Sequence, residues 1–453
     1  MSNTKDLDVL LGEPKRAIRS MTWAFLFAMA VIEVNQFVDT FWVSGLGTAS
    51  SSAVATVVPI YGLMMCAGLG VGVGATTSIA FRLGRKEHDA ANSLAGNALL
   101  LGFILSVISS VLIALLARPT IIMMGAEDVL TESIEYLIPY ILLSPALLCS
   151  SILGAVLRAE GAAKKSTVLQ ISAAVFNMIL DPVFIYGLGL GVLGAGLSTA
   201  ISALLSLFIG FFWYAKGETI VKLGRPSFKS DKAAMVEVLG VGAPKTVQAL
   251  ISNITDLVQR VFLIIAGGTT AVILYNFTWR YIGLVNLPGR ACDSAMIPVC
   301  SAAYGQNDLV KMKTAYYYTM KIVVGVGIIA SVLLFIFAEP LVTVLTLEDT
   351  MAELRPEFVW TLQVSVLLIP FSALMGIGSS MLQALKRAKI PMNYYMLWGF
   401  LKLGMYAVAA YAYGSYELII YSMVLVHVFG GICLIYLANR EYAKAEKKVA
   451  AVA

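Results

Sequence analysis

The residues of this sequence that could do chemistry are ionisable side chains inside long apolar stretches. In the first half they are three acids, Glu33, Asp39 and Asp181. Asn35 lies four residues before Asp39 and Asn177 four before Asp181, so on a helix each amide shares a face with its acid. Two buried carboxylates with amide and hydroxyl oxygens nearby can share a proton or enclose a hard cation. The pattern predicts a proton- or sodium-binding site, with helix-to-helix hydrogen bonding as the structural alternative.

The second half carries charge of the other sign. A stripe that recurs every four residues follows one helix face: Gln248, Ser252, Asp256 and Arg260. The remaining charges inside apolar stretches are Arg280, Arg290, Asp293 and Lys402. A charge at the bilayer centre costs about 2.5–3.5 kcal/mol, so we expect these residues to line or brace a polar cavity and not to face lipid. Internal ion pairs, Asp256 with Arg260 and Arg290 with Asp293, are the structural alternative.

The composition shows which elements must position these residues. Of 453 residues 59% are hydrophobic and only 13% are charged, whereas soluble domains carry roughly 25% charged residues. Lipid is therefore the main solvent, and each spanning helix needs about 20 mostly apolar residues. This rule predicts an all-helical membrane protein of twelve spans, near 17–44, 53–80, 90–116, 132–157, 165–186, 193–214, 236–265, 270–303, 312–338, 357–384, 391–412 and 417–439.

The basic residues predict the orientation of these spans. Most of the 32 lysines and arginines lie in the two tails and in the loops after even-numbered spans, whereas the other loops hold only Arg118 and Arg355. Cytoplasmic loops collect basic residues, so both termini are expected in the cytoplasm and the protein in the inner cell membrane. The first twenty residues lack the apolar core of a signal peptide, so the first helix is expected to stay in the membrane. The net charge of +5 follows from the same bias and predicts no nucleic-acid partner.

The chain reads as two halves. The polar segment 216–234 separates six spans from six, and Leu157–Lys164 resembles Leu382–Lys389 at a shift of 225 residues. We predict an N-terminal lobe at 1–215, a cytoplasmic connecting loop at 216–234, a C-terminal lobe at 235–440 and a cytoplasmic tail at 441–453. Parallel repeats of this kind are common in secondary transporters, with working sites near the middle of the membrane.

An ordered series of short motifs carries a family resemblance. They are Gly12-Glu-Pro-Lys, Val38-Asp-Thr-Phe-Trp-Val-Ser-Gly-Leu-Gly47, Phe81-Arg-Leu-Gly84, Leu157-Arg-Ala-Glu-Gly161, Asn177-Met-Ile-Leu-Asp-Pro182, Gly191-Val-Leu-Gly-Ala-Gly-Leu-Ser-Thr199, Trp279-Arg280 and Ala302-Ala-Tyr-Gly305. In order and spacing the chain resembles the multidrug and toxic compound extrusion (MATE) family, most closely the prokaryotic branch named for the DNA-damage-inducible protein F.

The resemblance implies two six-helix lobes in a V around a central cavity, with small organic compounds and drugs exported against an inward flow of protons or sodium. It implies a monomer with no cofactor besides the coupling ion. The implied cation site is Asp39, Asn177, Asp181 and Thr199, the only place where Na⁺ is expected. A tyrosine of the fourth helix also matches a family position, Tyr136 or alternatively Tyr140. The residues of the first apolar stretch add Glu33, Asn35 and Gln36 as cavity candidates. Close relatives bend their first helix at a proline, and Ala24 stands at that position here, so a proline hinge is not expected.

Other functions fit the residues less well. The basic second half favours an exporter of organic anions or metabolites on the same fold as the main alternative. Flippases of lipid-linked precursors resemble fourteen-helix proteins, and the acid-and-arginine signature of major-facilitator carriers is missing from Phe81–Asp89. The sequence contains no metal-hydrolase, serine-hydrolase or phosphate-binding motif, so no enzyme is predicted.

Overall fold

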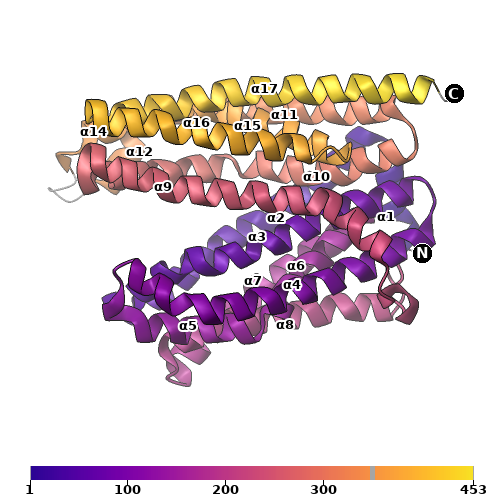
Figure 1. Ribbon diagram of the computed structural model, residues 1–453, viewed down its shortest axis with the longest axis horizontal. Coiled ribbons are helices and arrows are strands. Elements are labelled where there is room, and N and C mark those ends of the chain that lie inside the picture. The colour runs from indigo at the N-terminus through magenta and orange to yellow at the C-terminus, as the bar shows by residue number, and fades with distance from the viewer. Residues whose placement is uncertain (1, 347–351, 452–453) are drawn as a thin grey trace. The chain divides into compact units, whose positions relative to one another are not determined.

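The computed structural model describes residues 2–346 and 352–451, which contain helices and no strand (Figure 1). The helices of the first half are α1 (Ser2–Leu11), α2 (Pro14–Ser44), α3 (Thr48–Gly84), α4 (His88–Met123), η1 (Glu127–Val129), α5 (Leu130–Leu142), α6 (Ser144–Ala159), α7 (Ala163–Pro182), η2 (Val183–Gly187), α8 (Gly191–Ala215) and η3 (Arg225–Phe228). Those that follow are α9 (Lys232–Val285), α10 (Leu287–Gly305), α11 (Leu309–Ile336), α12 (Ala338–Leu345), α14 (Arg355–Ser365), η4 (Val366–Leu368), α15 (Ile369–Ala384), α16 (Lys389–Tyr413) and α17 (Tyr416–Ala450).

Several predicted spans are built from two helical pieces. The fourth is α5 followed by α6, bent by 56°, and Pro145 in the first turn of α6 removes a donor at the bend. Spans seven and eight meet inside α9, where Gly267 (φ −147°, ψ 17°) and Gly268 (φ 65°, ψ −160°) leave the helical conformation. The dihedrals of Gly268 are open to glycine and strained for other residues. This break occupies the gap predicted between 265 and 270.

The twelve predicted spans are present. By length and composition, the described residues hold nine helices able to cross a membrane, or ten with the bent α5–α6 pair. The division of α9 at its glycines and the 25-residue helix α16 supply the other two. The eighth span continues from α9 into α10, and the tenth from α14 into α15. The predicted fold class is confirmed, although the short helices α1 and α12 lie outside the predicted spans.

The described chain divides into two compact units. The first contains the described residues to Val247 together with Ser301–Asp308, and the second contains Gln248–Cys300 and the described residues from Leu309 onward. The start of α9 thus belongs to the first compact unit. The predicted lobes at 1–215 and 235–440 are a different division of the chain and remain a prediction.

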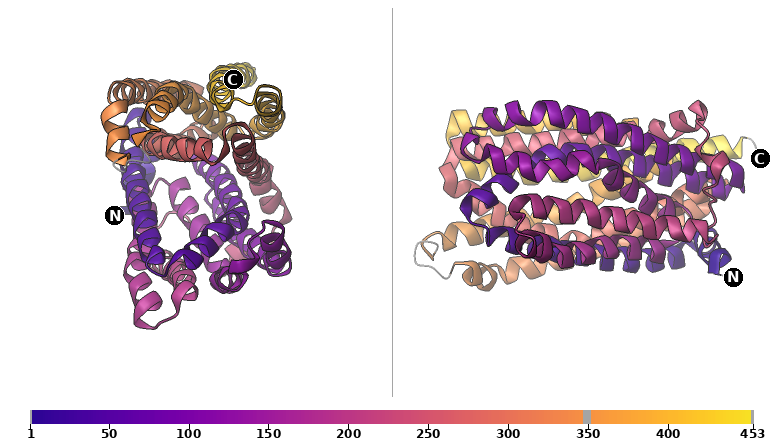
Figure 2. Two further views of the ribbon diagram at one scale, coloured as in Figure 1. Left: turned by 90° about the vertical axis from the view of Figure 1, so that its left-hand side faces the viewer. Right: turned by 90° about the horizontal axis from the view of Figure 1, so that it is seen from below.

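In the first unit, α2 packs against α7, α3 against α4 and α6, and α8 against α5 and α7. These helices run side by side along one direction, as the indigo-to-magenta ribbons of Figure 2 show. Glycines allow the close approaches: a Cβ on Gly196 of α8 would lie 2.5 Å from the carbonyl oxygen of Tyr136, and one on Gly194 would lie 2.7 Å from that of Phe184. The glycines therefore hold α8 tightly against α5 and η2, which fixes the polar residues that follow on α8.

The second unit is built around α15, which packs against α11 and α17, with α16 also against α17. Its apolar core combines residues from α9, α14, α16 and α17, among them Leu274, Phe358, Tyr406 and Ile420. α16 ends at Gly414 in the left-handed conformation (φ 57°), and the Ser415 hydroxyl caps α17 by accepting from the Leu418 amide at 3.2 Å. This hairpin brings the polar residues of α16 next to those of α17.

Candidate functional site

A hydrogen-bonded cluster joins α2, α7 and α8 in the first unit. The Asn35 amide nitrogen donates to Asn177 Oδ1 at 2.9 Å, which links α2 to α7. The Asn177 nitrogen in turn donates to Asp181 Oδ1 (3.0 Å) and faces the hydroxyls of Ser198 (3.0 Å) and Thr199 (3.4 Å). The Ser198 hydroxyl also donates to Asp181 Oδ1. Helix spacing predicted the Asn177–Asp181 pair, and tertiary packing adds α2 and α8.

The cluster contains buried acceptors without a donor. Among the described residues, Asp39 Oδ1, Asp181 Oδ2 and Asn35 Oδ1 are buried and have no hydrogen-bond partner. The carboxylates of Asp39 and Asp181 lie close enough for their charges to repel each other. A buried acceptor without a partner costs roughly 1–3 kcal/mol, and more when it is charged. A proton, a cation or a bound water would satisfy these oxygens.

Tyrosines from α3 and α5 lie beside the acids. Tyr136 and Tyr140 are buried and their hydroxyls are 3.0 Å apart, so the two sequence alternatives belong to one group. Tyr61 of α3 stacks on Tyr140 with ring centroids 4.6 Å apart. Asp39 lies close enough to interact electrostatically with the hydroxyl groups of Tyr61, Tyr136 and Tyr140. The first unit thus places an aromatic, weakly polar wall against its acidic cluster.

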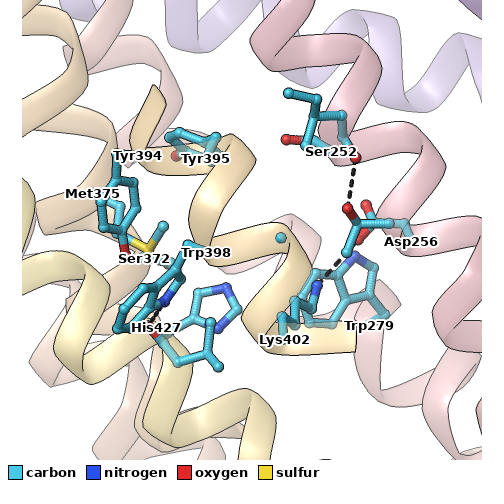
Figure 3. Close-up of a pocket in the computed structure, with 14 residues that line it drawn as sticks. Ser252, Asp256, Trp279, Ser372, Met375, Tyr394, Tyr395, Trp398, Lys402 and His427 are labelled. Carbon is cyan, nitrogen blue, oxygen red and sulfur yellow. Dashed lines mark hydrogen bonds and ion pairs between the residues drawn. The ribbon is translucent and has the colours of Figure 1, made fainter. Parts of the chain in front are cut away.

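The second unit contains a separate, partly open cavity of about 200 Å³, shown in Figure 3. Its lining residues come from α9, α15, α16 and α17: Ile251, Ser252, Thr255, Asp256, Trp279, Ser372, Met375, Tyr394, Tyr395, Trp398, Gly399, Lys402, Val426 and His427. Lys402 Nζ lies 3.4 Å from Asp256 Oδ1 and 5.6 Å from the centre of the Tyr406 ring. Asp256 therefore pairs with Lys402 of α16, which lies far away in sequence.

The other predicted cavity residues are spread more widely. In the second unit, buried Gln248 contacts Ser379 Oγ at 3.4 Å. Asp293 packs so closely on Gly376 that a Cβ there would lie 2.1 Å from Asp293 Oδ2. The exposed residues of the predicted sets are Gln36, Arg260, Arg280 and Arg290, and Glu33 is half-buried. The structure therefore joins Ser252, Asp256 and Lys402 in one cavity and leaves the three arginines on the surface.

Sequence reasoning missed most residues of the second cavity and two of the first site, and four of them are instructive. Ser198 donates to Asp181 but stands beside Thr199 in the same motif, and the family pattern favoured the threonine. Tyr61 is one of twenty tyrosines, without a distinctive neighbour. Trp398 and His427 line the second cavity four and twenty-five residues from Lys402. An aromatic residue one turn before a buried lysine was the signal available for Trp398.

A family model named MatE matches residues 24–183 and 244–401, which covers most of both halves. The chain belongs to the MATE family. The family resemblance read from the sequence is confirmed, while its finer branch stays a prediction. MATE proteins are membrane transporters and not enzymes, and the apolar helices of this chain make it a multi-pass membrane protein of that family.

Curated MATE relatives include exporters. The chain is 29% identical over 281 residues to the multidrug export protein MepA of Staphylococcus haemolyticus, a match over 60% of this chain and 59% of that protein. A FAD transporter of Shewanella oneidensis is 25% identical over 77% of this chain and 78% of its own length. The match thus spans less than two thirds of the length of the MepA proteins of Staphylococcus haemolyticus and Staphylococcus saprophyticus.

Solved structures share the whole fold. A MOP superfamily transporter from Pyrococcus furiosus, described as having a binding pocket of reversed polarity, superposes with a TM-score of 0.92 at 24% identity, over 98% of this chain and 99% of that one. MATE in complex with MaL6 gives the same TM-score at 25% identity and the same coverage. This likeness extends to both halves and accounts for the twelve helices.

Proposed function

We propose that the chain is a secondary antiporter that exports small organic compounds, drugs among them, from the cytoplasm in exchange for an inward cation. The observation that carries this proposal is the pair of buried, unpartnered oxygens on Asp39 and Asp181. Two carboxylates at one buried place cannot both remain ionised at low cost, so the cluster is suited to take up and release positive charge. The exporters among its relatives support the direction of transport.

The donors around Asp181 favour the proton as the coupling ion. Asn177 and Ser198 both direct donors at Asp181 Oδ1, which leaves Oδ2 as the acceptor for an added proton. A sodium ion would need several oxygen ligands, and the Asn177 side chain would have to turn its oxygen inward to supply one. Protonation also removes the repulsion between Asp39 on α2 and Asp181 on α7. The contact between these two helices therefore depends on the charge of the site.

The remaining assignments follow from this activity. The chain would act in the inner cell membrane with both termini in the cytoplasm, as the basic loops indicate. We propose that it works as a monomer, without a cofactor and with membrane lipid and its substrates as its partners. The lobes that alternate in access would be the six-helix halves.

Transport by the reconstituted protein tests the proposal. Proteoliposomes receive a pH gradient or a Na⁺ gradient separately, and uptake of cationic ethidium and anionic 1-naphthoate is recorded for each. The pH gradient alone should drive accumulation of at least one probe, and its collapse by a protonophore should abolish that accumulation. Accumulation driven by the Na⁺ gradient alone would indicate that sodium, and not the proton, is the coupling ion at the same two acids. Downhill leakage that ignores both gradients would refute antiport.

A further inference from the structure

The cavity of the second unit is a site in its own right. All its lining residues belong to that unit, and none belongs to the acidic cluster of the first. Its walls are aromatic: Tyr394 stacks on Trp398 with centroids 5.5 Å apart, and Trp279 lines the cavity from α9 (Figure 3). The Trp398 indole nitrogen donates to the Val426 carbonyl at 3.0 Å, which fixes the ring against α17. Flat apolar groups are what such walls recognise.

The ion pair in this cavity is unevenly exposed. The Lys402 side chain is 14% exposed, whereas that of Asp256 is 49% exposed. Asp256 is therefore the less buried partner, and Lys402 lies deeper. The two atoms are 3.4 Å apart, which is longer than the usual 2.7–2.9 Å of a charged hydrogen bond. A ligand can therefore compete for either partner.

The uneven exposure decides which charge a ligand should carry. A cation that binds Asp256 would leave the buried ammonium of Lys402 without a counter-charge, which is costly in a low-dielectric site. An anion that binds Lys402 keeps the deeper charge compensated and displaces only Asp256, the less buried partner. Displacing the aspartate therefore costs less than displacing the lysine, and the cavity favours anions.

Two further groups can orient an anionic ligand. Tyr394 is 8% exposed, and its hydroxyl is buried without a hydrogen-bond partner among the described residues, so a turn of the ring would let it donate to a ligand oxygen. His427 Nδ1 lies 2.8 Å from the Met423 carbonyl and must donate to it. Its ring therefore presents Nε2 to any further partner. The cavity combines a cation, a spare donor and aromatic walls.

We propose that this cavity binds planar aromatic anions, with the negative group on Lys402 and the rings among Trp279, Tyr394 and Trp398. An apolar cavity of about 150 Å³ takes up benzene, so about 200 Å³ suits one or two fused rings with a carboxylate. That the bound anion is a transported substrate rests on the proposed export function. That the cavity binds such an anion does not depend on it, so the experiment measures binding without any ion gradient.

Equilibrium binding of labelled 1-naphthoate to the full chain in lipid nanodiscs tests this proposal. The matched ligands are 1-naphthylmethylammonium and 1-naphthalenemethanol, which keep the rings and change the charge. The wild type should bind 1-naphthoate at least about tenfold more tightly than the cation, and Lys402→Gln should remove at least about tenfold of that affinity. Asp256→Asn should tighten binding, because it removes the competitor for Lys402.

The control is Arg260→Gln, which removes an exposed base four residues from Asp256 and outside the cavity, and it should leave binding unchanged. Equal or tighter binding of the cation, or unchanged 1-naphthoate binding in a folded Lys402→Gln protein, would overturn the proposal. If Lys402→Gln does not fold, Asp256→Asn decides: tighter binding supports the site, and equal or weaker binding rejects it. Binding that persists without gradient-driven export would instead reject the export function alone.

Discussion

At the scale of single residues, only one of the two carboxylate oxygens of Asp181 accepts hydrogen bonds from the described residues. Asn177 and Ser198 both donate to Oδ1, while Oδ2 is buried without a donor among the described residues. Donors on one oxygen stabilise the charged carboxylate, and burial of the other oxygen opposes it. The balance between these two effects sets the pH at which the acid can release a proton. Ser198 is therefore a positioning residue for the coupling step.

Ser198→Ala removes one donor from the Asp181 carboxylate. We expect the protein to fold and to transport, with the pH optimum of transport displaced to higher pH, because the less stabilised carboxylate holds its proton more firmly. The loss of one hydrogen bond to a charged group corresponds to roughly 1.5–3 kcal/mol, or about one to two pH units. The measurement is the pH profile of probe uptake in proteoliposomes.

The matched control is Ser202→Ala, one turn further along α8. The Ser202 hydroxyl donates to the backbone carbonyl of Ser198 at 2.6 Å and not to an acid. Its profile should coincide with that of the wild type. Equal displacement of both profiles would show that the effect comes from the packing of α8 and not from Asp181.

At the scale of elements, the segment after α8 is tied to the end of α6. The amides of Ile220 and Val221 donate to Glu160 Oε2 at 2.9 and 2.8 Å. Farther along, the Asp231 amide donates to Asn97 Oδ1 at 2.9 Å. Burial raises the pKa of Glu160 from 4.5 to about 8, against the two amide bonds and Lys165, which lower it. The nearby charge of Asp6 adds to the increase.

This raised pKa predicts a loop whose anchorage depends on pH. The folded state holds the Glu160 proton more firmly than the unfolded state, so its stabilising contribution is complete below about pH 4.5 and declines as pH rises to about 8. Hydrogen exchange at Ile220 and Val221, corrected for the intrinsic rate, should therefore accelerate over this range. Exchange at Asp231, held by a side chain that does not titrate, is the internal control.

The Glu160→Gln protein keeps an acceptor but cannot titrate, so its exchange at Ile220 and Val221 should lose the pH dependence. Persistence of that dependence, or the same dependence at Asp231, would assign it to another group.

The elements themselves were largely predictable, because a span of about 20 apolar residues leaves a clear pattern. Their bends were less so, since hydropathy reports what lies in lipid and not where the backbone turns. The span predicted at 132–157 is two helices for this reason. Local spacing also suggested Arg260 as the partner of Asp256. The partner is Lys402, 146 residues away, because tertiary packing of α16 on α9 decides it.

At the scale of the whole molecule, the alternation of basic loops predicts which residues face the cytoplasm. Cysteines introduced at exposed Lys222 and Arg387, in a background without the five native cysteines, should react with an impermeant maleimide only in inverted vesicles. A cysteine at Met123, the last residue of α4, which is 88% exposed, should react only in intact cells. Labelling of Lys222→Cys from outside would contradict the predicted topology.

The central claim is that Asp39 and Asp181 carry the proton that is exchanged for substrate. It is tested most directly by the proton current that accompanies substrate movement, read with a pH-sensitive dye inside proteoliposomes and a probe that the wild type transports. Asp39→Asn and Asp181→Asn should each abolish this current in folded protein. The Glu135→Gln protein, altered at an exposed acid next to Tyr136, should keep the current. A wild-type proton current in both aspartate variants would contradict the account.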